Sequence, residues 1–229
     1  MAEDIKYQVY RASQELYKQG LVIFKWGNVS AIDPSTGNIV IKPSGIAYDE
    51  MIPADMVVVD RDGKKVDGSF EATHDLDTHL ELYRNFPDIG AIVHSHSEWA
   101  TIWAQAGIGI PAYGISHANY FNGEVPCTRQ LTVEEINDNL ERHTGRLIVD
   151  TFREKKLDPN CIPAVLVNAH GPFVWGKTIQ EALDHATVLE QVAKLAYNTQ
   201  MLKNIEPIKK GLVDRYYEYR QEENLFSNS

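Results

Sequence analysis

The stretch Ile92-Val93-His94-Ser95-His96 joins an apolar run to two histidines spaced two residues apart. Its composition predicts a β-strand over Ala91–Ser95. Side chains two residues apart on a strand face the same way, with their backbones about 6.6 Å apart. Both imidazoles can therefore reach one metal ion. The pair by itself does not establish a metal site, because two polar residues at the end of a strand give the same pattern.

Two further signals favour the metal site. A predicted buried strand over Ala164–Asn168 is followed by Ala169-His170-Gly171-Pro172, which puts a third histidine where a strand gives way to a loop. Asp75 offers a carboxylate at the start of a predicted helix over residues 75–86. Three imidazoles and a carboxylate suit zinc, with Mn²⁺ or Co²⁺ as other divalent candidates, and leave room for a bidentate substrate. The chain has no H-E-x-x-H motif, which excludes the common zinc peptidase site.

The flanking sequence predicts strands that come first as hairpins and then alternate with helices. This order favours one α/β domain over residues 1–229, with a mixed or mostly antiparallel sheet covered by helices. Two capping boxes, Thr132–Glu135 and Thr178–Glu181, mark the starts of two long helices. Helices are predicted over residues 3–19, 75–86, 98–105, 132–154, 178–202 and 214–223, and strands over residues 22–24, 39–42, 56–59, 91–95 and 164–168.

The composition is that of an ordinary globular protein, with 43% hydrophobic and 24% charged residues. A formal net charge of -10 argues against nucleic acid or an anionic membrane as a partner. The sequence shows no apolar signal region at its start and no apolar stretch of membrane-spanning length, so we expect a cytoplasmic protein. An acidic chain of this kind binds a phosphorylated metabolite only where the site itself is locally positive.

Two glycine-containing segments have the composition of an anion-binding turn. Trp26-Gly27-Asn28-Val29-Ser30 and Lys42-Pro43-Ser44-Gly45 each follow a predicted strand, and Lys42 adds a positive charge. Turns also use such residues for conformational reasons alone. Of the remaining histidines, His74 and His117 flank segments that we expect to approach the metal. Those in predicted helices, His79, His143 and His185, are interpreted as structural or surface residues.

These segments resemble the L-ribulose-5-phosphate 4-epimerases of the class II aldolase/epimerase (adducin-like) superfamily. The similarity runs in order from about residue 5 to about residue 200, and it is closer than that to the fuculose- or rhamnulose-phosphate aldolases. It is carried by residues 26–33, 41–45, 92–97, 103–107, 126–129 and 170–177.

The resemblance implies a three-layer α/β fold and a homotetramer with active sites at subunit interfaces. It implies zinc on Asp75, His94, His96 and His170, in agreement with the spacing. It also implies a ketose phosphate whose phosphate lies against Gly27, Asn28, Ser44, Gly45, Thr73 and His74, with Lys42 nearby. The implied reaction interconverts L-ribulose 5-phosphate and D-xylulose 5-phosphate, in pentose (arabinose) catabolism, by retro-aldol cleavage and re-formation of the C3–C4 bond. Such a reaction needs two proton-transfer groups.

The sequence departs from the family pattern at those groups. Asn119 stands where the epimerases have an aspartate, and the tail Asn224–Ser229 lacks their C-terminal tyrosine, although Tyr216, Tyr217 and Tyr219 lie earlier. Thr73-His74 replaces a Ser-Ser phosphate pair, and Ile115 replaces a threonine. Candidates for the proton-handling position are therefore Asn119, His117 and His74.

These departures keep three alternatives open. The first is an epimerase of a different ketose, and the second is a class II aldolase or decarboxylase that acts on another sugar or sugar-acid phosphate. A non-enzymatic member of the adducin-head type is the third, and the intact metal set counts against it.

Overall fold

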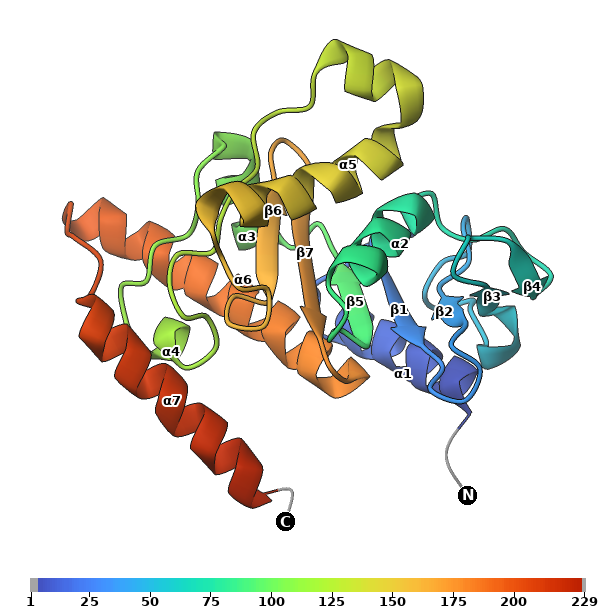
Figure 1. The fold of residues 1–229 in the computed structure, drawn as a ribbon, viewed down its shortest axis with the longest axis horizontal. Coiled ribbons are helices and arrows are strands. Elements are labelled where there is room, and N and C mark those ends of the chain that lie inside the picture. The colour runs from blue at the N-terminus through green and yellow to red at the C-terminus, as the bar shows by residue number, and fades with distance from the viewer. Residues whose placement is uncertain (1–3, 228–229) are drawn as a thin grey trace.

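The computed structural model describes residues 4–227, with side chains up to residue 223, and centres on one seven-stranded sheet (Figure 1). The strand order is β4-β3-β2-β1-β5-β7-β6, and every neighbouring pair is antiparallel. This confirms the predicted α/β class with a mostly antiparallel sheet. The strands are β1 (Asn28–Ile32), β2 (Ile39–Ile41), β3 (Val57–Val59), β4 (Lys65–Asp67), β5 (Ala91–His94), β6 (Ala164–Val167) and β7 (Gly171–Gly176).

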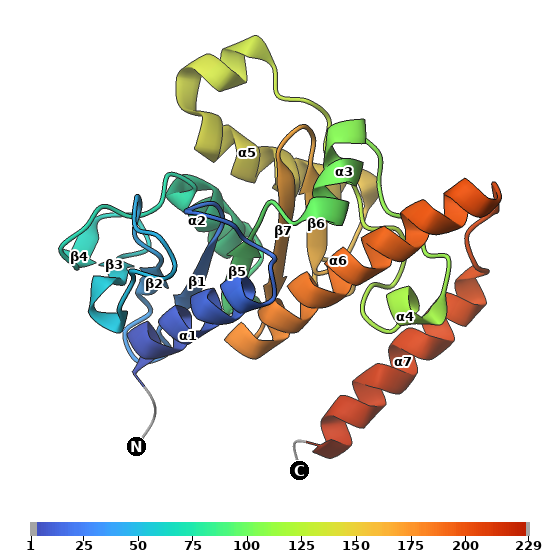
Figure 2. The same cartoon turned by 180° about the vertical axis from the view of Figure 1, so that it is seen from behind.

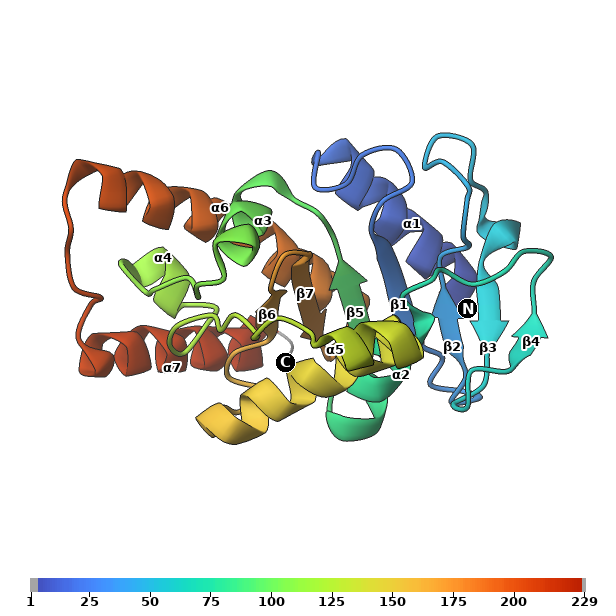
Figure 3. The same cartoon turned by 90° about the horizontal axis from the view of Figure 1, so that it is seen from above.

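Helices cover both faces of the sheet. Figure 2 shows α1 (Ile5–Lys18), α3 (Glu98–Ala106) and α6 (Ile179–Leu202) on one face, and Figure 1 shows α2 (Leu76–Asn85) and α5 (Val133–Lys155) on the other. Figure 3 shows the resulting three layers from above. A short helix, α4 (Ile115–Ala118), packs with α7 (Lys210–Ser227) beyond β6, and a 3-10 turn covers Pro53–Asp55. No helix in the described part of the chain is long and apolar enough to cross a membrane.

The central strands are mainly apolar because both faces of the sheet are buried. Val29, Ile41, Ile92, Leu166 and Phe173 are all completely shielded from solvent. At about 25 cal/mol per Å² of apolar surface removed from water, such side chains dominate the stability of the domain. The polar residues of the site lie at one end of these strands, so a rigid core holds them.

The two long helices begin where the sequence predicted. Thr132 Oγ1 accepts the backbone N–H of Glu135 at 3.2 Å, and Glu135 accepts the backbone N–H of Thr132 at 2.8 Å, which completes the first capping box. At the second, Thr178 caps Glu181, but the Glu181 carboxylate accepts from the backbone of Lys177 instead of Thr178. The predicted helix over residues 3–19 is observed as α1, and residue 3 lies outside the described residues.

The predicted strand at residues 22–24 is wrong. The strand of this region is β1, which begins at Asn28 and pairs with β5 so that Asn28 lies opposite His94. Positive φ angles at Gly20 (71°), Phe24 (52°) and Gly27 (76°) bend the chain repeatedly before the strand begins. Gly27 therefore directly precedes a strand, whereas the sequence predicted that it follows one. Strands β4 and β7 were not predicted from the sequence. In β7, Pro172 and the two glycines are residues that strands usually lack, and they leave only a short apolar run between them.

Candidate functional site

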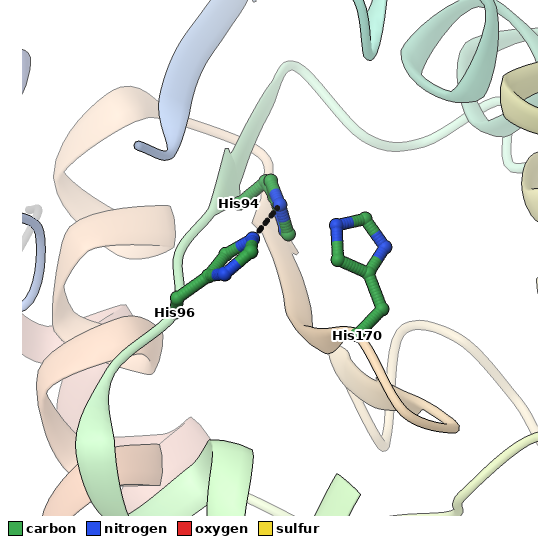
Figure 4. Close-up of side chains that lie close together, drawn as sticks. All are labelled: His94, His96 and His170. Atoms are coloured by element: carbon green, nitrogen blue, oxygen red, sulfur yellow. Dashed lines mark hydrogen bonds between the residues drawn. The ribbon is translucent and has the colours of Figure 1, made fainter. Parts of the chain in front are cut away.

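Three histidines from separate segments converge at one end of the sheet (Figure 4). His94 is the last residue of β5, His96 lies two residues beyond it, and His170 lies in the turn between β6 and β7. The Nε2 atoms of His94 and His96 are 3.2 Å apart, and one ring nitrogen from each of the three lies within 4.8 Å of the others. Because β5 and β7 are paired, with His94 opposite Phe173, the turn before β7 carries His170 to the end of β5.

The surroundings keep these rings neutral and fix the tautomer of His94. His94 Nδ1 lies 3.0 Å from the carbonyl oxygen of Pro172, which can only accept, so the proton is on Nδ1 and the lone pair on Nε2. The ring stacks on Phe173 with centroids 4.1 Å apart. Burial lowers the pKa of His94 to about 3 and also lowers the pKa values of His96 and His170, so all three rings are neutral near pH 7. Neutral imidazoles whose free nitrogens converge are suited to hold a divalent metal ion.

Asp75 lies beside this cluster. Its Oδ2 is 4.0 Å from His94 Nε2 and accepts a hydrogen bond from Asn28 Nδ2 at 2.7 Å. Asn28 also approaches Thr73 Oγ1, at 3.2 Å, and its own Oδ1 is buried with no partner among the described residues. Burial acts to raise the pKa of Asp75, but attraction to the histidines, His94 first, outweighs it at the low pH where they become protonated, and the pKa of Asp75 lies below its usual value. Asp75 is not among the side chains whose ligand atoms all lie within 4.8 Å of one another, so the structure groups three histidines and places the carboxylate against one of them.

A cavity of about 300 Å³ opens next to the histidines. Of the residues singled out in the sequence for substrate binding, only Asn28 is not part of the cavity wall. Asn28 instead donates a hydrogen bond to Asp75, which is part of the wall. Trp26 belongs to the anion-binding segment expected from the sequence, which gave it no role of its own, and its ring lies 5.7 Å from that of His96. The wall consists of Lys25, Trp26, Gly27, Lys42, Pro43, Ser44, Gly45, Thr73, His74, Asp75, His94 and His96.

Lys42 is almost completely buried and is bonded to backbone carbonyl groups. Its side chain is 2% exposed, and its ammonium donates to the carbonyl oxygens of Pro43 and Ile46, each at 3.2 Å. The ammonium also lies 4.8 Å from the centre of the Tyr48 ring. Burial, and then the charge of Lys25, lower the pKa of Lys42 to about 8. Lys42 is thus charged near neutral pH and holds the loop that carries Ser44 and Gly45.

A second cavity, of about 480 Å³, lies on the other side of the cluster and shares Asp75 and His170 with it. Its wall is mainly apolar and comes largely from α5 and the segment before it, including Leu131, Ile136 and Leu140. Nothing in the local sequence pattern relates these residues to the histidines.

The structure does not bring His117 and Asn119 to the histidine cluster of the same chain. Both belong to the α4 region, which packs against α6 and α7. His117 is buried, with Nε2 2.6 Å from the carbonyl oxygen of Gly123. Asn119 lines a separate cavity of about 510 Å³ together with Tyr120, Tyr216, Tyr219, Arg220 and Glu223.

The histidines interpreted as structural or surface residues have partners away from the cavity wall. His79 and His185 are buried, and they hydrogen-bond Ser30 and the carbonyl oxygen of Trp175, respectively. His143 pairs with Asp138 on α5.

Comparison with known proteins identifies the fold and the family. The chain is 45% identical over 225 residues to the L-ribulose-5-phosphate 4-epimerase UlaF of Salmonella paratyphi C (strain RKS4594), and the alignment covers 98% of each protein. Among solved structures, an L-fuculose 1-phosphate aldolase superposes with a TM-score of 0.81 at 22% identity, over 96% of this chain and 98% of that one. YgbL from Escherichia coli, described as a putative aldolase/epimerase/decarboxylase, superposes with a TM-score of 0.73 at 24% identity, over 93% and 97% of the two chains.

A family model supplies the remaining observation. The model described as class II aldolase and adducin N-terminal domain matches residues 7–197, which include all the strands and the three histidines. The chain therefore belongs to the class II aldolase and adducin N-terminal domain family, and within it to the epimerase and aldolase enzymes.

Proposed function

We propose that this protein is a metal-dependent epimerase that interconverts L-ribulose 5-phosphate and D-xylulose 5-phosphate, in pentose catabolism. The observation that carries the proposal is the convergence of His94, His96 and His170 beside a cavity of about 300 Å³, in a chain that is 45% identical to a named L-ribulose-5-phosphate 4-epimerase. We also propose that it acts in the cytoplasm.

The proposed metal ligands are the three histidines, with Asp75 as the fourth residue of the set. The fit rests on the donor chemistry, because His94 presents its Nε2 lone pair toward His96 and all three rings are neutral. Zinc is the proposed ion, since imidazole and carboxylate ligands suit it. Mn²⁺ and Co²⁺ can bind the same donors but generally with lower affinity. When bound, such an ion acts as a Lewis acid toward the ketose carbonyl and adjacent hydroxyl.

The chain's own residues then bind and orient the substrate. The 300 Å³ cavity would receive the phosphate end, with Ser44 and Thr73 offering hydroxyl groups and Lys42 a buried positive charge. Asn28 fixes the Asp75 carboxylate through a 2.7 Å hydrogen bond and so keeps it beside His94. The reaction breaks the C3–C4 bond, and the aldehyde fragment, glycolaldehyde phosphate, is attacked again on its other face.

Proton transfer at the C4 oxygen is proposed to involve a neighbouring copy of the chain. Asn119, Tyr216 and Tyr219 line a cavity that shares no wall residue with the two cavities beside the histidines of the same chain. A homotetramer with active sites at its subunit interfaces would place that cavity against the cluster of the adjacent subunit. An amide at residue 119 cannot exchange a proton near neutral pH, so Tyr216, Tyr219 or His74 is a candidate for this step.

One assay tests this function. Zinc-loaded protein is incubated with L-ribulose 5-phosphate, and the products are separated and identified. Formation of D-xylulose 5-phosphate supports the epimerase, whereas release of free glycolaldehyde phosphate identifies an aldolase. If neither product forms at any protein concentration tested, L-ribulose 5-phosphate is not the substrate.

Asn119 favours one second candidate, a class II aldolase or decarboxylase on another sugar or sugar-acid phosphate. Such an enzyme cleaves or forms a carbon–carbon bond without inverting C4, and it needs no carboxylate at residue 119. Screening ketose phosphates and sugar-acid phosphates for aldehyde or carbon dioxide release tests this candidate directly.

A further inference from the structure

Lys25 stands out in the cavity beside the histidines because its charge is not neutralised. Lys25 lines the cavity, and its charge is close enough to depress the pKa of Lys42. Within the described part of the chain, no carboxylate forms a salt bridge with Lys25, and Asp75 is the one acidic residue of the cavity wall. In a protein of formal net charge -10, this wall is a local concentration of positive charge.

The two lysines of the wall are not equivalent. The Lys42 ammonium uses two of its three N–H groups on the carbonyl oxygens of Pro43 and Ile46, and its side chain is 2% exposed. Lys25 is exposed, and its three donors have no partner among the described residues. Lys25 can therefore move its ammonium onto an incoming anion, whereas Lys42 can offer at most one hydrogen bond.

The backbone around Lys25 is held in an unusual conformation. Phe24 has a φ of 52°, a left-handed conformation that is uncommon for an aromatic residue. The turn closes through the Trp26 N–H, which donates to the carbonyl oxygen of Ile23 at 3.0 Å. The hydroxyl of the buried Tyr48 lies 3.0 Å from the carbonyl oxygen of Trp26 and 2.9 Å from that of Gly27. Strained backbone of this kind persists where the surroundings fix it, and it often marks a site that positions a ligand.

We propose that Lys25 is a specificity-determining residue, and that its ammonium binds the dianionic phosphate end of the substrate while Lys42 holds the loop. The inference rests on the proposed function for the identity of the substrate, but not for the anion site itself. The ligand is a phosphate monoester because two lysines and the hydroxyl-bearing residues Ser44 and Thr73 line the same cavity of about 300 Å³. Such a wall matches a doubly charged group with several acceptor oxygens.

The test compares Lys25→Met with Lys25→Arg and with Lys64→Met, a control at an exposed lysine outside both cavities of the histidine cluster. Binding of inorganic phosphate to the zinc-loaded protein is measured by calorimetry. A charge-assisted hydrogen bond corresponds to roughly 10–100-fold in affinity, so Lys25→Met should weaken phosphate binding by about that factor. Lys64→Met should bind phosphate like the parent protein, and Lys25→Arg should restore most of the affinity.

A kinetic readout separates charge recognition from a change in structure. With L-ribulose 5-phosphate, Lys25→Met should raise KM by a similar factor and change kcat little. Parent-like phosphate affinity in Lys25→Met would overturn the inference, as would a parent protein that binds no phosphate. If phosphate binding depends on Lys25 but L-ribulose 5-phosphate is not turned over, the anion site stands and the proposed substrate fails.

Discussion

Replacing Gly27 with alanine is the substitution whose effect the structure defines most closely. Gly27 has a φ of 76°, and it precedes the strand that pairs with β5. A Cβ atom built at Gly27 would lie 2.7 Å from the carbonyl oxygen of His94 and 2.7 Å from Val22 Cγ1. It would also lie 3.3 Å from Ser95 Cα, so the alanine presses directly on the backbone between His94 and His96.

Two penalties add at this position. Placing an L side chain in the left-handed region costs about 1–2 kcal/mol. Forcing a methyl group into a well-packed site costs about 1–3 kcal/mol more, because a backbone carbonyl cannot rotate away as a flexible side chain can. We therefore expect Gly27→Ala to lower the free energy of unfolding by about 2–5 kcal/mol. Moving the His94 backbone by a fraction of an ångström should also weaken metal binding and turnover.

Gly20 provides the matched control. It has a φ of 71°, but a Cβ there would meet no atom within 4 Å. Gly20→Ala should therefore show the conformational penalty alone. The assay is urea unfolding of the metal-free proteins at one fixed concentration, followed by measurement of zinc content after reloading. If Gly27→Ala is as stable as Gly20→Ala and retains full zinc, the close approach of Gly27 to His94 does not constrain the site.

Three further predictions concern the site. His96→Ala should lose bound zinc and turnover but keep its fold by circular dichroism, because the sheet core does not depend on the ion; full activity in a metal-free variant would contradict the ligand assignment. Since the pKa of Lys42 is lowered to about 8, the cavity loses a positive charge as pH rises through that value. Phosphate affinity measured by calorimetry should fall from pH 7 to 9, and a constant affinity would refute this. Asn119→Asp should raise epimerisation of L-ribulose 5-phosphate by up to about 10²–10⁴-fold if a proton carrier is missing; no gain, with activity on another ketose, would favour the second candidate function.

Features that depend on neighbouring residues could be predicted from the sequence. The capping residue Thr132 and the reciprocal Glu135 fix the start of α5 through bonds three residues apart, and such bonds can be read from the chain. The apolar run before His94 predicted a buried strand because both faces of the sheet are covered. The spacing of His94 and His96 predicted that both rings reach one point, and their Nε2 atoms are 3.2 Å apart.

The position of β1 was missed because the apolar residues before it lie in a segment that bends at three residues with positive φ, and the strand begins only after this segment. Propensity alone therefore favoured Val22–Phe24, where the chain turns. Only the pairing of Asn28 with His94 shows why Gly27 must be a glycine, since the Cβ contact involves a backbone 67 residues later in the sequence.

The tertiary structure alone decided how the site is assembled. His170 reaches His94 because β7 pairs with β5, and the Asn28–Asp75 hydrogen bond joins residues 47 positions apart. The burial that keeps the His94 ring neutral and turns the Lys42 ammonium toward protein carbonyls is likewise a property of the packed chain. The same packing separates Asn119 from the histidines of its own chain, although the sequence placed both in one site. Residue types and short spacings determine the local chemistry and can be read from the sequence. The distances between segments, and the electrostatic effects of burial, arise only when the sheet has formed.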